Sequence, residues 1–262
     1  MTIARLADRA VLAITGVDSR PFLQGLLTQD VDLLGPDRPL YAGLLSPQGK
    51  ALFDMLLFAG AGESVLVDVA ADRAAALVRR LSMYKLRRAV TIATSELAVW
   101  AGWDGAGEGA VDPRHPALGR RWLAPPAGDD GSALYAAHRR VIGVPETPEI
   151  GEDQLLWLET GADLLNGVSF TKGCYVGQEN TARMHHRDKV RRRLVPVTLA
   201  GEATDDVVRD ADGRSVGSLR GPVVEGQGFA HLRLEAAAGP LFVGTAPLTV
   251  RVPGWLAAEL AA

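Results

Sequence analysis

A single segment, residues 169–179, combines the only cysteine of the chain with two glycines and the start of a helix. Gly173 and Gly177 permit positive φ angles, so the backbone beside Cys174 can turn tightly or approach a ligand closely. The helix that follows would point its free N–H groups and its dipole back toward the thiol. A thiol between Lys172 and a helix N-terminus can have a lowered pKa, which favours the reactive thiolate. The alternative is a plain turn with a small, half-buried cysteine.

The composition bounds the class of protein. A chain of 262 residues with 47% hydrophobic and 23% charged residues is long enough for two or three globular domains. One cysteine excludes an internal disulfide and a cysteine-rich zinc or iron–sulfur site made by this chain alone, so we predict no resident metal. The net charge of −3 gives no general attraction to nucleic acid or to an anionic membrane, so such a partner would need a local patch.

The first residues give no sign of export. Asp8 interrupts the N-terminal segment before an apolar core of signal-peptide length can form. No apolar run approaches the roughly 20 residues that a membrane-spanning helix needs. We therefore expect no membrane partner and a cytoplasmic location, where a lone cysteine stays reduced.

The first half of the chain alternates short apolar runs with amphipathic segments. These patterns predict a mixed, antiparallel, ferredoxin-like unit, and neither a dinucleotide-binding fingerprint nor a P-loop is present. The predicted strands are residues 10–16, 41–46, 51–58, 64–69, 90–92 and 97–100, the predicted helices are 18–27 and 71–81, and residues 47–50 form a hairpin turn.

The second half changes character twice. Residues 102–131 are rich in glycine, proline and aspartate and are predicted to be irregular surface, whereas 133–140 is a helix and 147–153 a loop. After residue 194 the chain consists of short strands and turns, which is typical of a small β-barrel or sandwich. Its predicted strands are residues 194–199, 215–219, 228–234 and 248–252.

Two charged features have more than one interpretation. Asp54 is the single charge in an apolar strand, so it either accepts hydrogen bonds from backbone donors or points into a pocket. Residues 183–193 contain six Lys or Arg and form either a solvated linker or a site for an anionic tail or RNA phosphates. The adjacent His185 and His186 diverge unless the chain bends, which makes them poor metal ligands.

The sequence Lys-Gly-Cys-Tyr-Val-Gly-Gln-Glu at residues 172–179 is similar to the K-G-C-Y-x-G-Q-E signature of YgfZ-type folate-binding proteins. These proteins belong to the superfamily of the glycine-cleavage T-protein (GcvT). Residues 165–171 and 181–186 resemble the iron–sulfur cluster assembly branch of this family, which includes mitochondrial members.

The resemblance implies a GcvT-like α+β fold, with a ferredoxin-like folate-binding region around a central opening and a small C-terminal β-barrel. It divides the chain into a first lobe of residues 1–45 and 133–188 that carries the motif, a ferredoxin-like lobe of residues 46–132, and a barrel of residues 189–262.

The family also suggests site residues. T-proteins bind tetrahydrofolate and transfer an aminomethyl carbon with a carboxylate pair on a strand that matches Phe53–Asp54, of which only the second position is kept here. Their L-E-A-G-like segment, whose glutamate holds the pterin, has its similar place at residues 140–144, without a carboxylate. Cys174 and Asp54 are the implied reactive residues, and the implied contacts to tetrahydrofolate or a derivative are Thr28, Asp30, Lys172, Tyr175, Gln178, Glu179 and Arg183.

Three functions follow as expectations. The first is a folate-binding accessory factor for assembly or repair of 4Fe-4S proteins, in which Cys174 accepts a transient cluster, a persulfide or a one-carbon adduct, with A-type iron–sulfur carriers as partners that complete any cluster. The second is a tetrahydrofolate-dependent aminomethyltransferase or other one-carbon transferase with Asp54 as general base. The third, an RNA-binding adaptor using residues 183–193, ranks last because the protein is net acidic.

Overall fold

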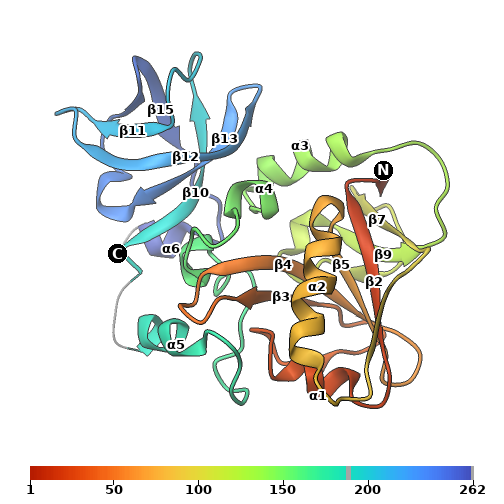
Figure 1. The fold of residues 1–262 in the computed structure, drawn as a ribbon. Coiled ribbons are helices and arrows are strands. Elements are labelled where there is room, and N and C mark those ends of the chain that lie inside the picture. Colours follow the sequence, from red (N-terminus) through yellow and green to blue (C-terminus); the bar gives the residue numbers. More distant parts are fainter. Residues whose placement is uncertain (187–189, 261–262) are drawn as a thin grey trace.

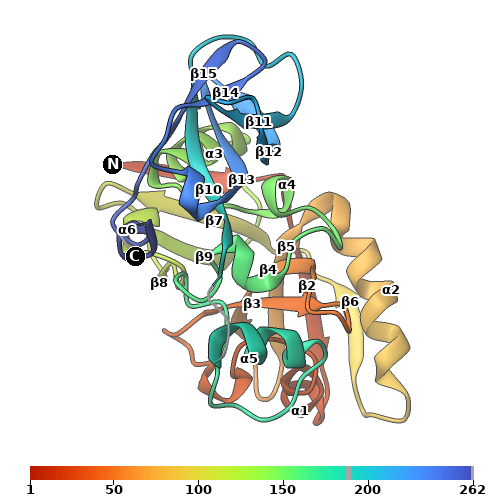
Figure 2. The ribbon, with the colours of Figure 1, turned by 90° about the vertical axis from the view of Figure 1, so that its left-hand side faces the viewer.

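The computed structural model describes residues 1–186 and 190–260. Two antiparallel sheets and their helices form the larger part of the molecule, and a closed barrel stands at one end of it (Figure 1). Helix α5 (Gln178–His186), which follows the cysteine motif, lies at the opposite end from the barrel in both views (Figure 2).

The central sheet has five strands in the order β3–β4–β5–β2–β6. Helices α1 (Ser19–Gln24) and α2 (Ala74–Lys85), with the 3-10 turn η2 (Ala71–Arg73), close one face around Phe22, Leu77 and Leu81. The strands are β2 (Arg9–Thr15), β3 (Leu40–Leu45), β4 (Ala51–Ala59), β5 (Val65–Ala70) and β6 (Thr91–Thr94).

The predicted hairpin is confirmed, and its sheet is covered on both faces. Strands β3 and β4 are buried almost throughout, which fits their continuous rather than alternating apolar runs. On the second face Trp157 packs so closely that a Cβ at Gly43 would lie 2.9 Å from its ring. Glycine at this position is therefore what lets the tryptophan reach the sheet.

A second sheet has four strands in the order β1–β7–β9–β8, and α3 (Ser132–Ile142) packs on it. Its strands are β1 (Thr2–Leu6), β7 (Ala98–Trp103), β8 (Ala110–Val111) and β9 (Arg120–Ala124). The prediction that residues 102–131 are irregular surface is wrong for β8, for β9, for the last two residues of β7 and for the turn η3 (Pro116–Leu118). Arg120, Arg121 and the turn residues made this region look exposed. The sequence does not reveal that Arg121 is buried, because the acid that pairs with it, Asp68, is 53 residues away.

The connection from α3 to the cysteine motif contains more helical turns than predicted. Residues 147–153 were expected to be a loop, but α4 (Thr147–Ile150) is a helical turn closed by a reciprocal capping box of Glu146 and Glu149. Further 3-10 turns are η1 (Val31–Leu33) and η4 (Trp157–Thr160). The predicted helix after the motif is confirmed as α5.

The C-terminal strands close into a barrel in the order β10–β13–β12–β11–β14–β15. The four predicted strands are present, and two short ones, β11 and β14, escape prediction because each has only three or four residues between turns. The strands are β10 (Arg192–Leu199), β11 (Val207–Asp210), β12 (Ser215–Val224), β13 (Gln227–Arg233), β14 (Leu241–Val243) and β15 (Ala246–Val250). The 3-10 turn η5 (Leu234–Ala236) connects β13 to β14, and helix α6 (Ala257–Leu260) follows β15.

The sheets do not follow the predicted lobe boundary at residues 45–46, which falls in the β3–β4 turn of one sheet. Strand β1 in turn pairs with β7, so residues from both predicted lobes share each sheet. Of the helices in the described part of the chain, none is long and apolar enough to cross a membrane.

Candidate functional site

Cys174 lies exposed in the loop that precedes α5. The loop is held from behind by Gly177, whose φ of +82° and contact with the Ser46 carbonyl leave no room for a Cβ. Asn180 adds a hydrogen bond from its amide to the Gln48 carbonyl at 2.9 Å. The thiol is therefore presented to solvent from a loop that is fixed to the β3–β4 turn.

Lys172 anchors the same loop on the other side. Its amine donates to the carbonyl oxygens of Gln24, Leu27 and Gln29 at 2.7–2.8 Å, and lies 5.3 Å from the centre of the Tyr175 ring. Burial lowers the pKa of Lys172 to about 8. Its three donors are taken by backbone carbonyls, so its place in the structure is that of a clamp between the motif and the end of α1.

Several predicted folate contacts have partners within the protein. Thr28 is fully buried, donates to the Gly167 carbonyl at 2.6 Å and accepts from the Gly43 amide at 2.8 Å. Asp30 accepts from the Gln24 amide group at 2.7 Å and caps η1 through the Asp32 amide. These side chains build the wall on which the cysteine loop rests.

The remaining motif residues order the start of α5. Gln178 accepts from the Tyr175 amide at 3.1 Å through its side-chain oxygen, and burial raises the pKa of the Tyr175 hydroxyl. Glu179 is exposed, and Arg183 donates to Asn180 at 2.8 Å.

The end of α5 is tied back to the segment before the cysteine. The His185 ring stacks on Phe170 with centroids 3.6 Å apart, and His186 meets His185 edge-on. Of the predicted basic run, residues 187–189 lie outside the described residues. Within the residues that the structure describes, no group of three His, Cys, Asp or Glu side chains could hold a metal ion.

The structure shows neither of the two predicted alternatives for Asp54, a backbone donor or a position lining one of the described hollows. It is 2% exposed, accepts from the Thr147 hydroxyl at 2.5 Å, and keeps its other carboxylate oxygen without a partner among the described residues. Burial raises the pKa of the Asp54 carboxyl, and the nearby Arg9 guanidinium opposes this rise. The hydrogen-bond donor is a side-chain hydroxyl from α4 and not the backbone donor that the strand pattern suggested.

Asp54 borders a buried network of ion pairs that sequence reasoning missed. Glu146 lies in it against Arg114, Arg139 and Arg9. Burial alone would raise the pKa of Glu146, but these three guanidinium groups hold it well below its usual range. The other pairs are Arg9–Asp68, Arg121–Asp68, Arg114–Asp112 and Arg139–Glu149, at 2.6–3.0 Å.

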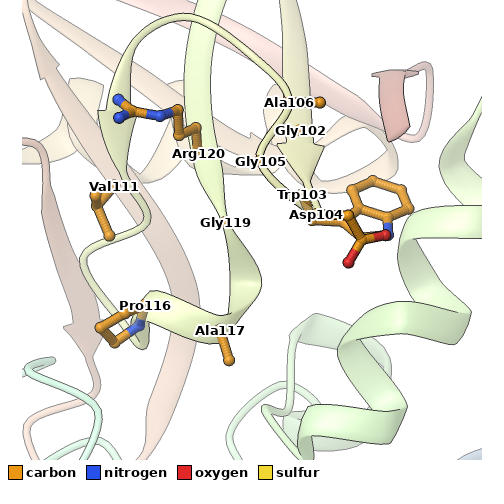
Figure 3. A pocket seen from close by; sticks show the side chains of 10 residues that line it. All are labelled: Gly102, Trp103, Asp104, Gly105, Ala106, Val111, Pro116, Ala117, Gly119 and Arg120. Carbon is orange, nitrogen blue, oxygen red and sulfur yellow. The ribbon is translucent and has the colours of Figure 1, made fainter. Parts of the chain in front are cut away.

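Two hollows in the described part of the chain do not include the residues expected to contact folate. A hollow of about 520 Å³ opens beside Tyr41 and Asn166, and one of about 340 Å³ lies between Trp103 and Arg120 (Figure 3). Neither is lined by Asp54 or Cys174. The expected folate contacts that instead make hydrogen bonds within the protein are Thr28, Asp30, Lys172, Gln178 and Arg183.

Sequence reasoning also overlooked one glutamate. Leu158–Glu159–Thr160–Gly161 matches the L-E-A-G-like pattern better than residues 140–144, which form the end of α3 and its cap. Glu159 accepts from the Leu156 amide at 3.2 Å and lies 3.4 Å from the His231 ring nitrogen on β13. The tetrapeptide itself was the signal that could have found it.

Comparison with known proteins agrees with this architecture. A family model described as "CAF17, C-terminal beta-barrel domain" matches residues 191–258. The mouse protein named iron–sulfur cluster assembly factor IBA57, mitochondrial, is 35% identical, with 97% of this chain and 85% of the mouse protein covered. The human protein of the same name is 34% identical, with 96% of this chain and 84% of the human protein covered. The chain belongs to the IBA57/CAF17 family.

Membership of the IBA57/CAF17 family confirms the resemblance drawn from the motif and makes this chain a homologue of iron–sulfur cluster assembly factors. The crystal structure of glycine cleavage system aminomethyltransferase T from Bartonella henselae superposes with a TM-score of 0.71 at 16% identity, covering 97% of this chain and 85% of that one. The predicted GcvT-like α+β fold with a C-terminal barrel is thus confirmed.

Proposed function

We propose that this protein is an iron–sulfur cluster assembly factor whose Cys174 thiolate supplies one ligand to a cluster in transit. The exposed thiol on a clamped loop is the observation that carries the proposal. The names of its IBA57 homologues in mouse and human support it. In this proposal the cluster is cargo that the protein passes on.

One thiolate does not complete the coordination of a cluster, which usually takes four cysteine ligands. The described residues around Cys174 offer no second and third ligand in a metal-binding group. The other ligands therefore come from a partner, and A-type iron–sulfur carriers are the class that we propose. Cys174 loses its proton on binding iron, so binding of the cluster is favoured where the thiolate fraction rises.

A thiol-relocation experiment tests the proposal. Cells that lack their native copy are given the wild-type chain, Cys174→Ser, or Cys174→Ser with Ser215→Cys, which places one exposed thiol on the barrel instead. The activity of a 4Fe-4S enzyme reports function. We expect restoration by the wild type alone. Full restoration by Cys174→Ser would refute the assigned role, and restoration by the relocated thiol would show that its position is immaterial.

Folate binding is a separate proposal that rests on the unpartnered buried oxygen of Asp54 and does not enter the cluster proposal. Equilibrium binding of tetrahydrofolate to the wild type and to Asp54→Asn, without oxygen, is the test. Binding that is lost in Asp54→Asn would support a folate site there, and no binding to either protein would end the proposal. The one-carbon transferase gains no support, since one Asp54 oxygen accepts from Thr147 and Phe53 stands at the other position of the T-protein carboxylate pair.

A further inference from the structure

Three aliphatic side chains protrude from the end of the molecule that is remote from the barrel. Val17 is 75% exposed, Met83 62% and Leu86 87%, whereas most large aliphatic side chains are buried. They lie where α2 ends beside the start of α1, at the bottom of both views (Figures 1 and 2). Large exposed apolar side chains that gather in one place mark an interaction surface.

The backbone holds these residues in one place. Asp18 accepts from the Ala89 amide at 2.8 Å, and the Asp18 amide faces the Ala89 carbonyl at 3.5 Å. Gly16 abuts the same carbonyl so closely that a Cβ there would collide with it. The turn at residues 86–89 is therefore docked on the β2–α1 turn that carries Val17.

Leu86 has an unfavourable backbone conformation. Its φ of +47° and ψ of −115° are rare for a residue with a side chain, and glycine would be the ordinary choice. A strained leucine that contributes nothing to the core gains no packing energy in return. Strain of this kind is characteristic of functional positions.

Cations are frequent in the sequence on either side of Met83 and Leu86. The segment from Arg73 to Val90 has no acidic residue. None of its exposed or half-exposed cations near the turn makes an ion pair with a residue that the structure describes. These cations are Arg79, Arg80, Lys85, Arg87 and Arg88. Together with Val17, Met83 and Leu86 they form what we call the cationic tip.

We propose that, contrary to the expectation of no membrane partner, the cationic tip docks the protein on the surface of an anionic lipid bilayer. The aliphatic side chains enter the headgroup region, and the arginines and lysine meet lipid phosphates. The net acidic chain requires a local patch for such an attraction, and the cationic tip is one.

Other macromolecules fit the tip less well. Nucleic acid favours aromatic side chains for stacking, and the protruding residues are all aliphatic. Protein interfaces centre on anchors that fill pockets in a desolvated, well-packed core. Tyr84, the aromatic residue of this helix end, packs against the core, and the arginines of the tip are exposed or half-exposed. Protruding aliphatic groups beside cations match an interface between apolar chains and anionic headgroups.

Vesicle flotation with the full chain tests the proposal. The probes are vesicles of phosphatidylcholine alone and vesicles with phosphatidylglycerol at roughly one lipid in four, which supplies the negative surface potential. We expect binding only to the anionic vesicles, weakened at about 0.5 M salt, where charges beyond roughly 4 Å are screened. No binding to anionic vesicles at low salt would overturn the proposal.

Two variants separate the contributions of charge and of insertion. Arg87→Glu with Arg88→Glu should reduce vesicle affinity at least tenfold, because each cation near such a surface contributes roughly 1 kcal/mol. Leu86→Gly should reduce it several-fold while leaving the fold intact, since glycine suits the positive φ. Arg214→Glu with Arg233→Glu, exposed cations of the barrel region, is the matched control and should bind like the wild type.

The remaining outcomes are also decisive. If the barrel control weakens binding as much as the tip variant does, the attraction is not local and the proposal is wrong. Unchanged affinity in Leu86→Gly, together with equally tight binding of an RNA oligonucleotide, would assign the tip to nucleic acid instead. Cys174→Ser should bind vesicles like the wild type, so failure of the cluster proposal and failure of this one are distinguishable.

Discussion

At the scale of single residues, the loop that presents Cys174 depends on one amine. Lys172→Met removes the donor to three carbonyls, and we expect a loss of about 1–3 kcal/mol in stability, because buried acceptors are left unpaired. Amide exchange should accelerate in residues 24–29 and 169–177. Lys50→Met, whose exposed amine donates to the Asp153 carbonyl, is the control and should show neither change.

Asp54 gives a prediction for pH. Its pKa is raised in the folded protein, so the folded state binds the proton more tightly than the unfolded state does. The cost of ionisation is therefore absent well below pH 4 and fully present above the folded pKa. We expect Asp54→Asn to have a higher thermal midpoint than the wild type at pH 7, and the difference to vanish as the pH falls. A lower midpoint at pH 7 would contradict this.

At the scale of elements, α5 is seated on the β3–β4 turn through Gly177. Gly177→Ala places a Cβ against the Ser46 carbonyl at a positive φ, so it combines collision with backbone strain. Gly213→Ala has a similar φ of +78° in open space and tests the strain alone. Chemical denaturation should show a loss of about 1 kcal/mol for Gly213→Ala and a larger loss for Gly177→Ala. Equal losses of stability in the two variants would mean that the contact between Gly177 and the Ser46 carbonyl is not tightly packed.

At the scale of the whole molecule, the buried ion pairs join both sheets and α3. Glu146 meets Arg9 from β2, Arg139 from α3 and Arg114 from the β8–β9 segment. Its lowered pKa means that its contribution is present above about pH 4.5, the usual value for glutamate, and is lost as the pH falls through the folded value. The protein should therefore lose stability in acid through this network.

Glu146→Gln tests the network. At pH 7 we expect a loss of about 3–5 kcal/mol in unfolding free energy, because three buried guanidinium groups lose their shared carboxylate. The difference in unfolding free energy between Glu146→Gln and the wild type should become smaller below about pH 4.5. Glu235→Gln, at an 80% exposed side chain, is the control and should match the wild type throughout. If the difference in unfolding free energy does not depend on pH, Glu146 is not the cause of the loss of stability in acid.

The sequence by itself determined the element types and the family. Apolar runs and turn residues predict the β3–β4 hairpin, α2, α3 and four barrel strands, because strand and helix periodicity are local properties. The motif at residues 172–179 predicts a relative of the YgfZ and T-proteins, and the IBA57 homologues confirm it. Composition alone excludes a cluster held by this chain's cysteines.

Only the tertiary structure decided where the charges of the chain reside. The sequence placed Lys172 beside the thiol, but its amine reaches carbonyls 143 to 148 residues away. Arg121 looked like surface and is fully buried, and Asp54 found its donor in Thr147, 93 residues later. A buried charge is stable only beside a partner, and such partners are brought together by packing between sheets, which no local pattern of residues encodes.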